Sequence, residues 1–218
     1  MNPDILINNV CLYGAPRNGT TLLRMILKYL SKNVESSHIW FKTELPIVIV
    51  YRDPRDVAVS IWRFNEGTYD KDGKLTNRMF DNEQKTNSLI CRAKAYMEET
   101  IRCIDYYKDR KNAWIIRYRD FYNNYDFIFS GLEKLLNIYI SDRLKNKIIE
   151  NTKIDYIKKI QNKYNSSEEF DYDTGIHGHH VYHVTPQIWR TEVPDKYKES
   201  FVGQLEDVII KLGFNPFI

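Results

Sequence analysis

Short apolar runs alternate with amphipathic stretches along the first part of the chain. Mostly apolar residues over 5–13 and the run Ile47-Val48-Ile49-Val50-Tyr51 predict buried strands, the second of the kind covered on both faces of a parallel sheet. Leucine and isoleucine recur at helical spacing over about 20–31, and residues 34–41 predict another short strand. This order of elements indicates an α/β architecture.

The later part of the chain continues these patterns. Apolar spacing predicts four more elements, namely helices over about 90–104, 128–136 and 201–212 and a strand over 114–118. The segments 64–87 and 164–185 lack a period, so we expect them to be loops that cover an acceptor or nucleotide. We expect one α/β domain over 1–218, with a central, mainly parallel sheet flanked by helices in three layers.

Composition and charge argue against several classes of protein. Lys and Arg total 32 against 29 Asp and Glu, a net charge of +3 that does not indicate nucleic-acid binding. No apolar run reaches the roughly 18 to 20 residues of a membrane span, and the first residues do not have the pattern of a signal peptide. Three scattered cysteines lack the spacing of a disulfide framework. We therefore expect a cytoplasmic protein.

A glycine-framed loop follows the first predicted strand. The segment Gly14-Ala15-Pro16-Arg17-Asn18-Gly19-Thr20-Thr21 has the Gly-x-x-x-x-Gly frame of a P-loop, in which backbone N–H groups and a helix N-terminus surround a phosphate. Thr20 takes the position at which a Walker A loop has its lysine, which argues against ATP hydrolysis. Arg17 and two threonine hydroxyls offer charge and donors instead. The loop predicts a P-loop NTPase-like fold.

A second polar motif follows the strand 47–51. Arg52 comes directly after this strand, and Ser60 lies two helical turns further on in Arg52-Asp53-Pro54-Arg55-Asp56-Val57-Ala58-Val59-Ser60. The carboxyl ends of strands in open parallel sheets face the ligand crevice. Arg52 and Ser60 are therefore placed to converge on a second phosphate.

Together the two motifs resemble those of the cytosolic-type sulfotransferases, which use 3′-phosphoadenosine 5′-phosphosulfate (PAPS). Residues 16–21 are similar to the family's Pro-Lys/Arg-Ser-Gly-Thr-Thr, and residues 52–60 meet Arg-Asn/Asp-x-x-Asp-x-x-x-Ser at each key position. The segment Arg117-Tyr118-Arg119-Asp120-Phe121 is similar to Arg-Tyr-Glu-Asp-Leu. The resemblance implies in-line sulfuryl transfer from PAPS to a hydroxyl or amine of a small-molecule or saccharide acceptor. The product nucleotide is 3′,5′-ADP (PAP), and no metal is required.

The resemblance also implies roles for single residues. The 5′-phosphosulfate would be held by Arg17, Asn18, Gly19, Thr20 and Thr21, the 3′-phosphate by Arg52 and Ser60, and the adenine by Tyr118. Trp189 and Arg190 match the end of the family's Gly-x-x-Gly-x-Trp-Lys/Arg and are expected at the nucleotide. Both glycines of that motif are absent, as is the Arg-Lys-Gly that grips the 3′-phosphate; Val181, Tyr182 and His183 stand nearby instead.

Sulfuryl transfer needs a base on the acceptor and a cation on the leaving phosphate, and Arg17 is the expected cation. His38 stands at the end of the predicted second strand, 14 positions before Arg52, which is close to the spacing of the family's Lys-Thr-His motif. An imidazole suits this role at neutral pH. Glu44, in Lys42-Thr43-Glu44-Leu45-Pro46, and Glu35 are the alternative bases.

Other features leave alternatives open. The histidines His177, His179, His180 and His183 lack a familiar zinc spacing, so we expect no metal site there. Five aromatic residues of the expected cover loops either stack on an acceptor or pack the loops, namely Phe64, Tyr69, Phe80, Tyr172 and Tyr182. A P-loop kinase of a small metabolite and a catalytically silent nucleotide-binding module are the alternative functions.

Overall fold

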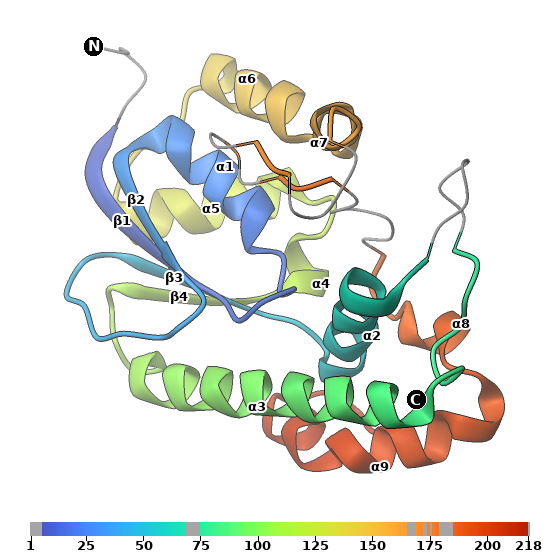
Figure 1. Ribbon diagram of the computed structural model, residues 1–218. Coiled ribbons are helices and arrows are strands. Elements are labelled where there is room, and N and C mark those ends of the chain that lie inside the picture. Colours follow the sequence, from blue (N-terminus) through green and yellow to red (C-terminus); the bar gives the residue numbers. More distant parts are fainter. Residues whose placement is uncertain are drawn as a thin grey trace.

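The central sheet consists of parallel strands in the order β2-β1-β3-β4 (Figure 1). A computed structural model describes residues 6–68, 75–164, 169–171, 174, 176–178 and 185–217. In it, β1 (Ile7–Tyr13) pairs with β2 (Ser31–Ser37) and with β3 (Ile47–Tyr51), and β3 pairs with β4 (Ala113–Arg117). The parallel sheet that the sequence predicts is confirmed.

Helices cover both faces of this sheet, which gives the three expected layers (Figure 1). One face packs against α1 (Thr20–Leu30), α5 (Tyr125–Leu136) and α6 (Asp142–Thr152). The other face packs against α3 (Glu83–Tyr107), and α3 in turn packs against α2 (Pro54–Glu66) and α9 (Asp195–Lys211). Three shorter helices complete the described elements: α4 (Tyr118–Phe121), α7 (Ile154–Gln161) and α8 (Trp189–Glu192).

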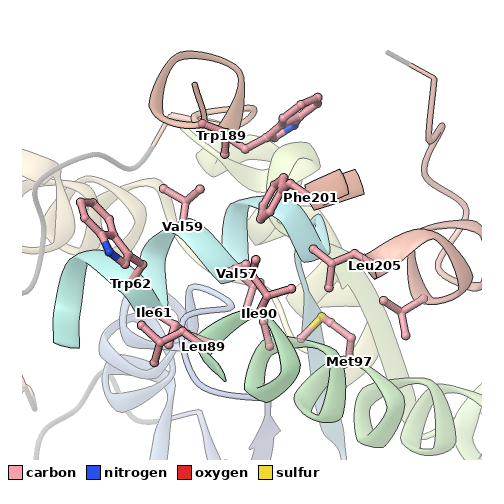
Figure 2. Packing of buried hydrophobic residues seen from close by; sticks show 14 of the residues in the cluster. Val57, Val59, Ile61, Trp62, Leu89, Ile90, Met97, Trp189, Phe201 and Leu205 are labelled. Carbon is pink, nitrogen blue, oxygen red and sulfur yellow. The ribbon is translucent and has the colours of Figure 1, made fainter. Parts of the chain in front are cut away.

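Alternation along the inner strands divides the core between these layers. Val48 and Val50 of β3 face α1 and α5, whereas Ile47 and Ile49 face α3, and all four are fully buried. Beyond α3, side chains of α2, α3 and α9 form a further apolar cluster (Figure 2). A strand buried on both faces is expected to be continuously apolar, which is why the run 47–51 predicts β3 with its observed bounds.

The second strand and the loop 64–87 differ from their predicted bounds. The chain passes from α1 into β2 without a loop, so the second strand spans Ser31–Ser37 rather than 34–41, and Ile39 beyond it is 74% exposed. The expected loop 64–87 is shorter, because α2 continues to Glu66 and α3 begins at Glu83. The Asn82 side chain caps α3 by accepting a hydrogen bond from the Lys85 backbone N–H at 3.0 Å.

Candidate active site

The carboxyl ends of the strands bring the predicted site residues to one edge of the sheet. The loop 14–19 follows β1, His38 follows β2, Arg52 follows β3, and Tyr118 follows β4. All four contribute to a cavity of about 310 Å³, as do Thr20, Thr21 and Ser60. The strand order places β2, together with α1, on one side of β1, and it places β3 on the other side. The cavity therefore lies where ligands bind in open α/β sheets.

The loop after β1 has the backbone geometry of an anion site. Gly19, at the N-cap of α1, has a φ of 92°, and a Cβ there would lie 2.4 Å from the Tyr118 ring, so only glycine fits. No side chain caps the N-terminus of α1, and its first turn carries no acidic residue. The first N–H groups of the helix, at its positive dipole end, are therefore suited to a phosphate.

The side chain of Asn18, a residue expected at the nucleotide, contacts β3. Its side chain is fully buried and donates a hydrogen bond to the Val50 carbonyl at 3.2 Å. It is not among the residues that line the cavity. The side chain therefore holds the loop against β3, and it contributes to the site by positioning the loop.

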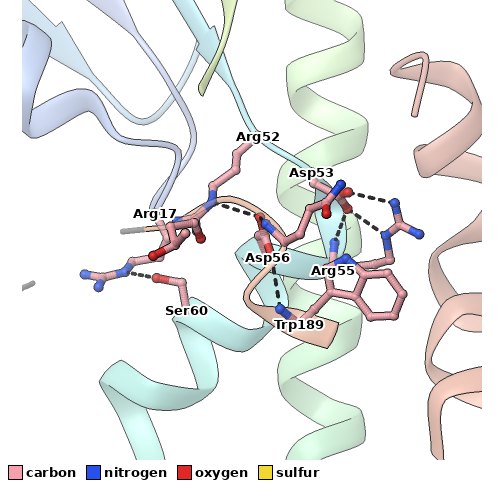
Figure 3. A network of polar contacts seen from close by, with 9 residues as sticks. Arg17, Arg52, Asp53, Arg55, Asp56, Ser60 and Trp189 are labelled. Carbon is pink, nitrogen blue, oxygen red and sulfur yellow. Dashed lines mark hydrogen bonds and ion pairs between the residues drawn. The ribbon is translucent and has the colours of Figure 1, made fainter. Parts of the chain in front are cut away.

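The two predicted anion motifs meet through a side-chain hydrogen bond. The Nε of Arg17 donates to the Oγ of Ser60 at 3.0 Å (Figure 3). The Arg17 guanidinium lies 4.8 Å from the centre of the Phe64 ring. Arg17 has a φ of 72°, a left-handed conformation that non-glycine residues adopt infrequently. The loop thus directs Arg17 across the cavity toward α2.

Arg52 is buried between Tyr118 and α2. Its guanidinium lies 4.6 Å from the centre of the Tyr118 ring, and its Nε lies 3.6 Å from the Oδ2 of Asp56 (Figure 3). Its Nη2 donates to the Thr185 carbonyl at 3.5 Å. Burial raises the pKa of Tyr118 to about 12, so the phenol keeps its proton at neutral pH.

Asp56 joins α2 to the C-terminal segment. This fully enclosed carboxylate accepts hydrogen bonds from the backbone N–H of Gln187 at 2.8 Å and of Trp189 at 3.2 Å. Burial raises the pKa of Asp56, against the opposing effects of Arg52 and the two N–H donors. Gln187 has a φ of 68°. The carboxylate therefore holds residues 185–189 over the end of the cavity that contains Arg52.

Neither Trp189 nor Arg190 lines the cavity, although both were expected at the nucleotide. The Trp189 ring is buried, with the Arg55 guanidinium 4.4 Å from its centre, and Arg190 lies 5.2 Å from the same ring. Ile188 is the member of this segment that reaches the cavity. Trp189 instead anchors the segment in the core cluster of α2 and α9 (Figure 2).

His38 is oriented by the backbone of the loop that follows β1. Its Nδ1 lies 2.7 Å from the Gly14 carbonyl oxygen. Because a carbonyl can only accept, Nδ1 carries the proton in this bond, and the neutral ring keeps a lone pair on Nε2. The two carboxylates considered as alternatives do not line the cavity: Glu44 pairs with Arg110 at 3.2 Å, and Glu35 lies 3.9 Å from the Cys11 thiol.

Several cavity residues carry no recognisable signal in the sequence. They come from the turn after α4, the start of α5, and α6 and α7, and comprise Tyr122, Asn123, Tyr125, Thr152, Ile154 and Ile157. The Tyr125 hydroxyl lies 3.0 Å from that of Thr152, which joins the two segments. In the sequence these residues belong to ordinary amphipathic helices and their ends, and only the packing of those helices reveals a second wall.

The expected cover loops contribute only in part. Phe64 lines the cavity, whereas Phe80 is buried and stacks on Tyr197 with ring centres 4.3 Å apart, so it packs the core. The other three aromatic residues considered there, Tyr69, Tyr172 and Tyr182, lie outside the described residues. His177 lines the cavity, while His179, His180 and His183 also lie outside them, as do Val181 and Val184.

The described residues contain neither a candidate metal site nor a candidate membrane span. Among them, no group of three or more His, Cys, Asp and Glu side chains is arranged to hold a metal ion. No helix in the described part of the chain combines the length and apolar character that crossing a membrane requires.

Comparisons with known proteins agree with this geometry. The family model of the sulfotransferase domain matches residues 36–202, which include His38, Arg52, Ser60 and Tyr118 but not the loop 14–19. No curated protein sequence matches the chain.

Solved structures share the fold. A mouse sulfotransferase, SULT7A1, complexed with PAP superposes with a TM-score of 0.64 at 13% identity, over 93% of this chain and 84% of that one. Retinol dehydratase with retinol and PAP gives 0.62 at 15% identity, over 92% and 81% of the two chains. The same enzyme with androsterone and PAP gives 0.61 at 13% identity, over 92% and 80%. Because the family model covers well over half of the sequence, the chain belongs to the sulfotransferase domain family.

Proposed function

We propose that this protein moves a sulfuryl group from PAPS to a hydroxyl or amine acceptor, with His38 as the base. The observation that carries the proposal is the convergence of the loop 14–19, His38, Arg52 and Tyr118 on one cavity. The cavity offers helix N–H groups and hydroxyls at the N-terminus of α1, and a buried arginine beside an aromatic ring at the ends of β3 and β4. A nucleotide with anionic groups at both its 5′ and 3′ positions matches this arrangement.

In this proposal the nucleotide lies across the strand ends. Its 5′-phosphosulfate is bound by the N–H groups of the loop and by Thr20 and Thr21, and its 3′-phosphate by Arg52 and Ser60. The adenine lies against Tyr118, opposite the wall that α6 and α7 provide. PAP in the three similar structures supports this assignment at the level of the shared fold.

The chemical step follows from this placement. The acceptor oxygen or nitrogen attacks the sulfur in line while Nε2 of His38 takes its proton, and the bond between sulfur and the bridging 5′-phosphate oxygen breaks. That oxygen keeps the electron pair, and the product nucleotide leaves as 3′,5′-ADP (PAP). The charge that develops on it is stabilised by Arg17 and by the N-terminus of α1. No step in this scheme uses a metal ion.

The acceptor is expected to approach on the His38 side. A second cavity of about 230 Å³ shares Thr20, Thr21, His38 and His177 with the first but does not include Arg52, Ser60 or Tyr118. An acceptor in it reaches the base without displacing the nucleotide. We keep a small molecule or saccharide as the acceptor class. The free thiols of Cys11, Cys91 and Cys103 support a cytoplasmic location.

The proposal is tested by turnover. The purified chain is incubated with ³⁵S-labelled PAPS and a panel of phenols, alcohols, amines and saccharides, and the labelled product is separated by chromatography. We expect transfer by the wild type and a loss of about 100-fold or more with His38→Ala, because general-base catalysis contributes about 10²–10⁴-fold. PAP affinity should survive in His38→Ala.

Parallel incubations separate the competing functions. Phosphoryl transfer from ATP and Mg²⁺ without sulfuryl transfer would replace the proposal by a metabolite kinase. PAP binding without transfer to any acceptor would indicate a silent module. Full turnover by His38→Ala would move the role of base to Glu35 or Glu44, and the variants Glu35→Gln and Glu44→Gln would identify which.

A further inference from the structure

Arg63 lies in an environment that leaves part of its hydrogen-bonding capacity unused. Its side chain extends from α2, is only 9% exposed and lines the main cavity. Its Nη2 lies 2.6 Å from the Oε1 of Glu192 in α8. Its Nε and Nη1 are shielded from solvent and have no hydrogen-bond partner within the described structure. Buried donors of charged groups are normally satisfied, so these two nitrogens point to an acceptor that arrives with a ligand.

The helical phase places Arg63 on the nucleotide side of the cavity. It follows Ser60 by three residues and Asp56 by seven, so the three side chains share one side of α2. Its ion pair with Glu192 holds it against the C-terminal segment, where the Thr185 carbonyl accepts a hydrogen bond from Arg52. Arg63 therefore belongs with Arg52 and Ser60, whereas His38 approaches the cavity from β2.

The neighbouring groups also leave room for another donor. Arg52 already faces the Asp56 carboxylate, and the Ser60 hydroxyl already accepts a hydrogen bond from Arg17. A phosphate dianion bound by Arg52 and Ser60 alone would contact one hydroxyl and one cation whose charge the Asp56 carboxylate already balances. A guanidinium that binds a carboxylate through one nitrogen can donate to phosphate oxygens through its others.

We infer that Arg63 is a third ligand of the nucleotide 3′-phosphate and helps to select 3′-phosphorylated adenosine nucleotides. This inference rests on the proposed function, because it takes the 3′-phosphate to lie between Arg52 and Ser60. In this inference α2 contributes three groups to nucleotide selection, namely Asp56 behind Arg52, the hydroxyl of Ser60, and the buried edge of Arg63.

Calorimetric titration with PAP and with 5′-AMP tests the inference. Arg63→Gln is expected to weaken PAP binding about tenfold and 5′-AMP binding less than twofold, because only PAP carries the 3′-phosphate and a charge-assisted hydrogen bond is worth about this much. Arg63→Lys keeps the charge but not the planar fork, and should weaken PAP binding about threefold. Glu192→Gln is the matched control, since it removes the charge of the ion pair but keeps an oxygen that can accept from the Arg63 Nη2 and hold the guanidinium, and PAP affinity should stay within about twofold.

The outcomes are distinct. Equal losses for PAP and 5′-AMP, or a Glu192→Gln effect as large as that of Arg63→Gln, would reduce Arg63 to a structural tie and overturn the inference. So would an unchanged PAP affinity with a higher KM for the acceptor, which would place Arg63 at the acceptor. If Arg63→Gln does not fold, the comparison of Arg63→Lys with Glu192→Gln decides between the same outcomes. Failure of the wild-type chain to bind PAP would overturn the proposed function itself, and this inference with it.

Discussion

Arg52 shows how a single buried charge is prepared for a ligand. The residue is 6% exposed, and it is held by a carboxylate at 3.6 Å, a carbonyl at 3.5 Å and an aromatic face at 4.6 Å. Its Nε nevertheless has no hydrogen-bond partner within the described structure. Burial of a cation is costly unless its partners compensate for lost water, so an incoming phosphate gains a donor that is already oriented and desolvated.

Replacing this residue should therefore affect nucleotides unequally. Arg52→Ala is expected to weaken PAP binding about 10- to 100-fold, the range for a charge-assisted hydrogen bond to an ionised group, and 5′-AMP binding less than about threefold. Arg119→Ala is the control, because Arg119 is a nearby exposed arginine outside the cavity. Calorimetry measures both ligands. Parallel losses for PAP and 5′-AMP would contradict the assignment of the 3′-phosphate to Arg52.

The sequence identifies site residues that belong to a short local motif, and it misses those placed by contacts with distant segments. Arg52 and Ser60 stand at fixed distances after an apolar strand, and Thr21 follows a glycine-framed loop, so their placement at the cavity could be predicted. Asn18 stands in the same loop, but its side chain turns inward to the Val50 carbonyl, which no sequence pattern reveals. Arg63 gave no signal either, because a lone arginine in an amphipathic helix is normally a solvated residue.

At the scale of elements, α2 connects the nucleotide site to the C-terminal segment. The N-terminus of α2 carries Asp53, whose side chain accepts from the Arg55 backbone N–H at 3.0 Å, and one turn later Asp56 binds two backbone N–H groups of residues 187–189. The helix is thereby joined to a segment 131 residues away in sequence. Such a connection cannot be read from helical periodicity, because the partner groups are backbone amides.

Removing the charge of Asp56 should loosen this connection. Asp56→Asn keeps one acceptor oxygen but leaves Arg52 without its carboxylate and one of the two amides without an acceptor, so we expect the free energy of unfolding to fall by about 2–4 kcal/mol. Hydrogen exchange at the Gln187 and Trp189 amides should accelerate about tenfold or more, and PAP affinity should fall. Asp53→Asn, which keeps the capping oxygen of α2 and spares Asp56 but removes the charge of the Asp53–Arg55 ion pair, serves as control. Identical exchange rates in the two variants would show that Asp56 does not hold the segment.

The boundaries of an element could be predicted where the element is buried along its length, and less well where it is partly exposed. The run 47–51 became β3 with its expected bounds because both of its faces are covered. The strand β2 lies at the edge of the sheet and most of its residues are partly or fully exposed, so its pattern is weak and its bounds shifted. The wall formed by α6 and α7 was missed for a different reason, since helical spacing fixes which face is buried but not what that face meets.

At the scale of the whole molecule, the site joins parts that are distant along the chain. The strand order β2-β1-β3-β4 places at one edge residues that lie between position 14 and position 118, and α7 and residues 185–189 close the cavity from further along the sequence. Helices on both faces of the sheet hold these strand ends in place, and the cavity is lined from α1 and from α2. In the proposed function, one small molecule would therefore contact both layers of helices.

A ligand held in this way should stabilise the whole domain. PAP at about 100 times its Kd is expected to add about 2.7 kcal/mol to the free energy of unfolding, which corresponds to a rise in Tm of roughly 5–10 °C for a chain of this length. At the same concentrations 5′-AMP should give a clearly smaller rise, and Arg52→Ala should reduce the rise with PAP to that level. Asp207→Asn, which breaks an exposed ion pair between α3 and α9 far from the strand ends, should leave it unchanged. Scanning calorimetry with each nucleotide measures these shifts, and equal rises with PAP and 5′-AMP in the wild type would contradict a second anion site at the strand ends.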